Sequence, residues 1–109
     1  MQKEKIIILI LPIKLREVDL DRYDVVELEK ISNVKVEIHE VINFLYPGFE
    51  KAFMNTIKNK RLKSFNSFKL WKENFEKILN NYQEIIIIKN INPDNFTTFR
   101  FNLFFKKYK

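Results

Sequence analysis

The hydrophobic positions of the chain form two unbroken runs and one alternating run. Lys5–Leu11 and Glu84–Lys89 are continuous apolar stretches rich in isoleucine, a pattern typical of strands buried on both faces. Val34–Val41 alternates apolar and polar side chains, which predicts a half-exposed strand at the edge of a sheet. We therefore expect three strands, two of them buried.

Between these strands, apolar residues recur at helical spacing. The spacing is clearest in Phe68–Tyr82, where Ser67 is placed to cap the first turn. The basic, polar stretch Asn59–Ser64 is predicted to be a loop. The predicted helices are Asp21–Ile31, Pro47–Asn59, Phe68–Tyr82 and a last one that starts at Pro93 or Asp94.

The predicted order β-α-β-α-α-β-α makes residues 1–109 a single α/β domain. Right-handed crossovers make its strands parallel, in a small three-stranded sheet of order 2-1-3. This is about half of a doubly wound domain, a Rossmann-like half domain. The order leaves Glu84–Lys89 at an edge although its pattern is that of a buried strand. We therefore expect a missing neighbour, supplied by a second protomer or by the rest of a longer protein.

The composition argues against several kinds of functional site. The chain has no cysteine, which excludes disulfides and thiolate chemistry and is typical of the reducing cytoplasm. A single histidine predicts no metal site. The loop Pro12–Asp19 has no glycine where a dinucleotide-binding fold needs several, and no P-loop is present, so we predict no cofactor. The longest apolar run, Ile6–Ile13, is far shorter than the ~20 residues that span a membrane.

The charge is divided unevenly along the chain. Of the net +6, residues 1–50 carry −3 and residues 51–109 carry +9. The basic half could attract a sugar nucleotide, an acidic membrane surface or nucleic acid, or it could be a solvated face. Aromatic residues after Lys58–Lys63 follow a helical stripe and are expected in the core, not exposed as stacking platforms. We therefore expect no nucleic-acid partner, and a peripheral contact of the basic rim with the acidic surface of the inner membrane, or with a partner protein, fits better.

Ligands of open parallel sheets bind beyond the carboxyl ends of the strands, where the connecting loops diverge. In this chain those loops carry several polar side chains. The candidate binding residues are Lys14, Arg16, His39, Asn92 and Asp94. No residue pattern identifies a catalytic group among them.

These candidates also have structural alternatives. Lys14 and Arg16 could meet a phosphate or pair with nearby acids such as Asp19. His39 could act as a general base or be a structural histidine. Glu40 points to the opposite face of a regular strand from His39, so the two residues do not form a dyad.

The last predicted helix is apolar most of the way round. Three of its aromatic residues, Phe101, Phe105 and Tyr108, lie off the main apolar stripe. One small sheet cannot cover such a helix. We therefore expect Phe101, Phe105 and Tyr108 to form an interface with another molecule or domain.

Several short stretches together carry a resemblance to a known group of proteins. They are Lys5–Lys14, Asp21–Tyr23, Glu27–Glu29, Val36–Glu40, Leu45–Pro47, Lys63–Phe68 with Trp71, and Glu84–Ile88. In these the chain resembles the N-terminal part of glycosyltransferase-like proteins of bacterial surface-polysaccharide (capsule or lipopolysaccharide) biosynthesis. The resemblance implies two Rossmann-like halves with a sugar nucleotide between them, of which this chain is similar to the first, acceptor-side half.

Two functions therefore stand as hypotheses. The first is an acceptor-side domain of a glycosyltransferase-like protein, inactive alone and acting with a sugar nucleotide or glycan acceptor. The second is a non-enzymatic interaction or assembly module that dimerises through its last helix or its third strand. Both leave an apolar surface that needs a partner, either a homo-oligomer or a missing C-terminal half.

Overall fold

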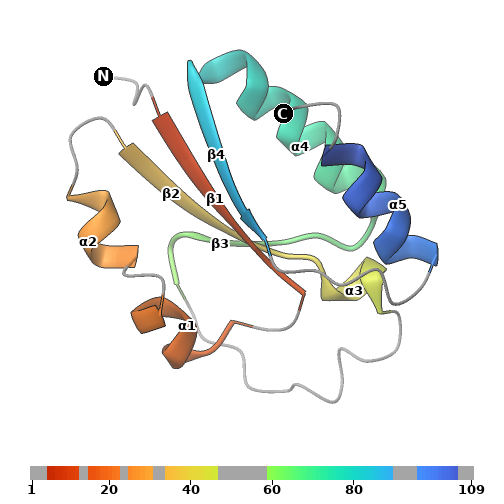
Figure 1. Cartoon of the computed structure of the whole chain (residues 1–109), viewed down its shortest axis with the longest axis horizontal. Coiled ribbons are helices and arrows are strands. Elements are labelled where there is room, and N and C mark those ends of the chain that lie inside the picture. The colour runs from red at the N-terminus through yellow and green to blue at the C-terminus, as the bar shows by residue number, and fades with distance from the viewer. Residues whose placement is uncertain are drawn as a thin grey trace.

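The computed structural model describes residues 5–12, 15–22, 25–30, 34–46, 59–89 and 96–105, with side chains except those of 17, 18 and 96–99. Strands and helices alternate along most of this part of the chain (Figure 1). The elements are β1 (Lys5–Leu11), α1 (Glu17–Arg22), α2 (Val25–Glu29), β2 (Val34–Glu40), α3 (Ile42–Leu45), β3 (Leu62–Ser64), α4 (Phe68–Asn81), β4 (Glu84–Lys89) and α5 (Phe96–Phe105).

The sheet has four parallel strands in the order β3-β2-β1-β4. The parallel α/β sheet is confirmed, but the prediction of three strands in order 2-1-3 was wrong, because β3 extends the sheet beyond β2. This strand lies in the stretch predicted to be a loop. It is short and polar, so no apolar pattern announces it, and backbone hydrogen bonds hold it: Ile38 N–H donates to Arg61 O (2.9 Å) and Phe65 N–H to Glu40 O (3.2 Å).

The helices also differ from the predicted ones. The stretch predicted as one helix, Asp21–Ile31, contains the end of α1 and all of α2. The prediction for α4 is confirmed, including its cap, since the Ser67 hydroxyl accepts a hydrogen bond from Leu70 N–H. The predicted helix Pro47–Asn59 falls almost wholly outside the described residues.

Two apolar cores lie on the two faces of the sheet, because successive side chains of β1 point to opposite sides. Ile6, Ile8 and Ile10 pack toward α3, α4 and α5, whereas Ile7 and Leu9 pack toward α1 and α2. Figure 1 shows the same division, with α1 and α2 on one side of the sheet and α4 and α5 on the other. The central strand β1 is therefore buried on both faces, as its sequence predicts.

Aromatic rings fill the core beneath α4 and α5. Trp71 and Phe75 stack with their centroids 5.0 Å apart. Phe101 approaches Trp71 at 4.9 Å and Phe44 of α3 at 5.5 Å, and Phe105 approaches Trp71 at 5.4 Å. Phe101 and Phe105 are therefore buried within the chain, and their predicted role as an intermolecular interface was wrong. The physical reason is that α5 packs against α3 and α4 as well as the sheet, so two sides of the helix are covered.

The burial of β2 and β4 is the reverse of what their sequences predict. In β2, which was predicted to be half exposed, Lys35 alone is exposed. In β4, which was predicted to be buried on both faces, no residue is fully buried, and Ile86 is 41% exposed. Their positions explain this difference. β2 lies between β1 and β3, whereas β4 pairs with β1 and with no other described strand.

Candidate functional site

The expected rim residues that the structure describes, Arg16 and His39, are both engaged in contacts within the chain. The Arg16 guanidinium is bound to the nearby carboxylate of Asp19, with Nη2 3.1 Å from Oδ1. This contact is the ion pair that the sequence offered as an alternative to phosphate binding. The other candidates at the loops after β1 and β4, Lys14, Asn92 and Asp94, lie outside the described residues, as does Tyr108.

His39 is completely buried, and both of its ring nitrogens are bonded within the chain. Trp71 Nε1–H donates to His39 Nδ1 at 3.0 Å. Because Nδ1 accepts this bond, the ring proton lies on Nε2, which donates to Glu37 Oε1 at 3.0 Å. The histidine thus connects a core indole to a carboxylate and has no open approach for a substrate, which is the arrangement of a structural residue.

Glu37 is ionised although it is buried. Burial alone would raise the pKa of its carboxyl, but the hydrogen bonds from His39 and Lys63 and the positive charge of Lys63 outweigh this and lower the pKa to about 2. Two lysines reach the same oxygen, Oε2, with Lys63 Nζ at 3.1 Å and Lys35 Nζ at 3.5 Å. Burial lowers the pKa of His39 despite the neighbouring carboxylate. A neutral histidine therefore donates to a charged Glu37.

Glu40 is a second buried acidic residue, and its side chain connects neighbouring segments at the carboxyl end of β2. It accepts hydrogen bonds from Leu15 N–H at 2.6 Å and from the Ser64 hydroxyl at 2.9 Å. These bonds tie the end of β2 to the segment after β1 and to β3. The two residues at the carboxyl end of β2, His39 and Glu40, thus serve to hold the fold together.

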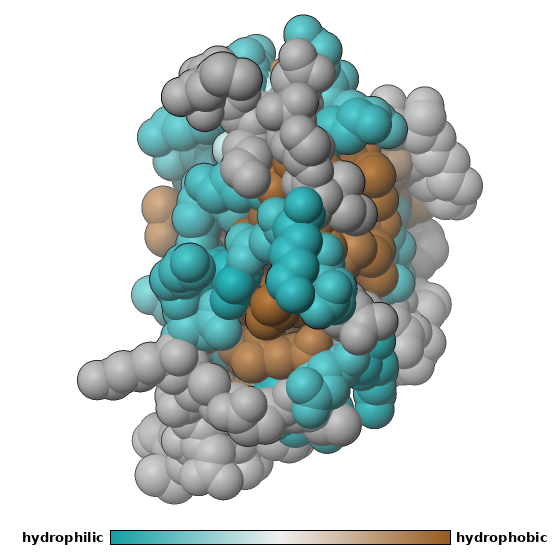
Figure 2. All heavy atoms as spheres, turned by 90° about the vertical axis from the view of Figure 1, so that its left-hand side faces the viewer, coloured by the Kyte–Doolittle hydropathy of each residue, from teal (hydrophilic) through white to brown (hydrophobic). Residues whose placement is uncertain are grey.

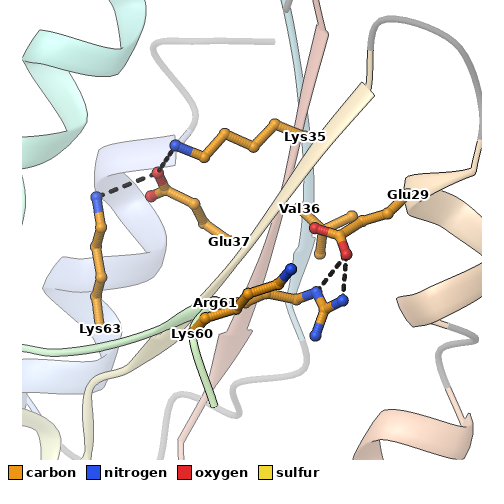
Figure 3. A pocket seen from close by; sticks show the side chains of 7 residues that line it. All are labelled: Glu29, Lys35, Val36, Glu37, Lys60, Arg61 and Lys63. Atoms are coloured by element: carbon orange, nitrogen blue, oxygen red, sulfur yellow. Dashed lines mark hydrogen bonds and ion pairs between the residues drawn. The ribbon is translucent and has the colours of Figure 1, made fainter.

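A hollow of about 170 Å³ lies along β2. It is rich in basic side chains. Figure 3 shows Lys35, Glu37 and Lys63 on one side of the strand, and Arg61 and Glu29, joined by an ion pair, on the other. The residues that line it are Glu29, Lys35, Val36, Glu37, Lys60, Arg61 and Lys63.

The outer edge of β4 is a second exposed feature. Within the described residues β4 pairs with β1 alone, and four consecutive isoleucines, Ile85–Ile88, form its centre. On the side of the molecule that carries α1 and α2, the described surface is mostly hydrophilic around a hydrophobic centre (Figure 2). An apolar strand with one edge that no described strand pairs with is the more unusual of the two features.

The described residues contain no group of three side chains placed to hold a metal ion. None of the described helices is both long and apolar enough to cross a membrane. Comparisons with family models, with curated proteins and with solved structures found no match to this chain.

Sequence reasoning missed two partners of His39. Glu37 lies two residues earlier on the same strand, so strand alternation already places both side chains on one face. The pairing of His39 with Glu37 was therefore predictable from the strand pattern, although only Glu40 was considered as its partner. Trp71 lies 32 residues further on, and no local signal in the sequence connects it to His39.

Proposed function

We propose that the chain is an assembly module that associates with a second copy of itself through the outer edge of β4. The observation that carries the proposal is an edge of β4 that no other described strand pairs with, in a strand whose middle is entirely isoleucine. Of the two contact surfaces expected from the sequence, α5 is occupied within the chain, since Phe101 and Phe105 are buried. The strand remains.

The physical support is that β4 itself carries none of the sequence features that usually protect an edge strand. Natural edges are blunted by lysine, proline, a bulge or very short length, because free backbone groups pair with other chains. β4 is six residues long and its charges stand at its two ends, on Glu84 and Lys89. Its centre is therefore an apolar template for another strand.

Symmetry restricts how two copies can pair. A two-fold axis perpendicular to the sheet makes the strands antiparallel and keeps each side chain on its own face. Residues that lie opposite each other must then be both even-numbered or both odd-numbered. Pairing centres on Ile86 against Ile86 or on Ile87 against Ile87, and in both registers isoleucines meet across the seam.

The test is the solution mass of the chain over a wide range of concentration. We expect a dimer for the native chain and a monomer for Ile86→Lys, because lysine at an edge opposes strand pairing. Val26→Lys is the matched control, since Val26 is also an exposed apolar residue, 57% exposed, but lies on α2. A native chain that stays monomeric at high concentration would refute the proposal, as would equal effects of the two lysine variants.

A second candidate is the acceptor-side domain of a glycosyltransferase-like protein, with this chain as a Rossmann-like half. The observation that favours it is the strand order. The chain adds β2 and β3 on one side of β1 and then β4 on the other side, and ligands of open α/β sheets bind at the point where the order changes sides in this way. In such a two-domain protein a strand of the second half would cover the edge of β4. A native chain that is monomeric and binds an apolar dye favours this candidate over self-assembly.

A further inference from the structure

Helix α5 has an outer side that faces away from the aromatic core. Its inner residues, Phe101, Phe104 and Phe105, are at most 8% exposed and pack against α3 and α4. Leu103 is 41% exposed. Successive residues of a helix are about 100° apart around its axis, so Leu103 lies on the opposite side of α5 from Phe101 and Phe105.

The sequence gives this outer side an apolar stripe. Phe96 and Phe99 precede Leu103 by seven and four residues, the spacing that places three positions on one face of a helix. A stripe of this kind normally packs against a core, but the core of this chain lies on the other side of α5. The helix lies beside α4 at the outside of the molecule (Figure 1). Its outer stripe therefore suits a contact with another apolar surface.

Basic side chains stand on and beside α5. Arg100 of the helix itself is exposed. The Lys72 ammonium of α4 lies 5.9 Å from the ring centroid of Phe104, and the Lys89 ammonium of β4 lies 5.4 Å from that of Phe105. Two lysines from different elements thus reach the helix, in addition to its own arginine.

The C-terminal part of the sequence adds to this charge. Residues 95–109, which contain α5, have four basic residues and no acidic one. The acidic residues of the neighbouring α4, Glu73 and Glu76, are outnumbered by its three lysines. The apolar stripe of α5 therefore lies in a positively charged part of the chain, and charge complementarity favours an anionic partner.

We propose that the outer side of α5 binds the surface of a membrane that contains anionic lipids. The apolar stripe would enter the boundary between head groups and acyl chains, and the basic side chains would lie among the anionic head groups, as in other interfacial helices. A second copy of this face fits less well, because it would bring like charges together. The inference does not rest on the association through β4, which uses a different surface.

The first test measures sedimentation of the chain with lipid vesicles. We expect binding to vesicles of phosphatidylcholine and phosphatidylglycerol, and binding at least about tenfold weaker to phosphatidylcholine alone. Leu103→Gln should weaken binding to the anionic vesicles by about fivefold to tenfold, because an apolar side chain no longer enters the membrane. Leu70→Gln is the matched control. Leu70 is 51% exposed, and it lies two residues from Lys72 and so on the side of α4 that faces away from α5.

The contribution of charge is measured with a second pair of variants. Arg100→Gln should weaken binding to the anionic vesicles by about fivefold, the usual effect of one basic residue near such a surface. Lys60→Gln makes the same change of charge before β3, at the opposite edge of the sheet from β4, and should have little effect. Equal binding to the two kinds of vesicle, no binding to either, or equal effects of the two leucine variants would overturn the proposal.

The second test locates the contact on the chain. Because the chain has no cysteine, Leu103→Cys provides a single site for a fluorophore whose emission shifts to the blue in an apolar environment. Anionic vesicles should shift the emission of a label at this position and leave that of a label in Leu70→Cys unchanged. Equal shifts at the two positions would overturn the proposal. Both tests are repeated in the Ile86→Lys chain, which separates membrane binding from association through β4.

Discussion

At the residue scale, the clearest feature is a line of polar contacts that starts in the aromatic core and ends at the surface. It runs from Trp71 through His39 and Glu37 to Lys63. Each residue forms a hydrogen bond with the next, so both ring nitrogens of the buried imidazole and the buried carboxylate have hydrogen-bond partners. Buried networks of this kind are stabilising when complete and costly when broken.

This line of contacts predicts how stability depends on pH. Burial lowers the pKa of His39. Once the pH falls below about 6.5, the imidazole therefore binds a proton in the unfolded chain but stays neutral in the folded chain. The free energy of unfolding should therefore fall as the pH is lowered through this range, by at most about 1.4 kcal/mol per pH unit. Glu37, with its pKa of about 2, adds a second loss below about pH 4.5.

His39→Gln provides the control for the upper range. Glutamine can accept from Trp71 and donate to Glu37 but does not titrate, and His39 is the only histidine. Urea unfolding between pH 7 and pH 5 should show a slope for the native chain and a nearly flat line for the variant. The same slope in both would mean that His39 is not the group responsible.

At the scale of the elements, α5 shows how a correct pattern leads to a wrong conclusion. The helix is apolar on several sides, and this predicts more than one packing partner. The sequence does not say that α3, a helix of four residues, supplies one of them. Phe44 of α3 lies 5.5 Å from Phe101 by ring centroids, so the extra partner is local.

We therefore expect Phe101→Ala to lower the free energy of unfolding by about 3–5 kcal/mol, as for other buried phenylalanines. Leu103→Ala, on the same helix but 41% exposed, should change it by about 0.5 kcal/mol. Chemical denaturation measures both. If Phe101→Ala left stability unchanged and instead abolished association, α5 would be the intermolecular surface after all.

At the scale of the whole molecule, the sequence predicted the parts that follow from hydrophobic periodicity. These are the parallel α/β class, the central β1, the edge position of the last strand and the helix α4. It failed where an element has no apolar pattern of its own: β3 is held by backbone hydrogen bonds to β2. The burial of His39 against Trp71 depends on packing between distant segments, which periodicity does not encode.

The open edge of β4 connects the fold of the whole molecule to its association. If the dimer forms by pairing β4 strands, association adds to folding stability, and the melting temperature must rise with protein concentration. For a domain of this size, we expect about 3–5 °C for each tenfold increase. In Ile86→Lys, whose lysine opposes strand pairing, the melting temperature should be independent of concentration. Differential scanning calorimetry of the two proteins over the same concentrations measures this dependence. A melting temperature of the native chain that does not change with concentration would show that β4 does not pair with β4 of a second copy.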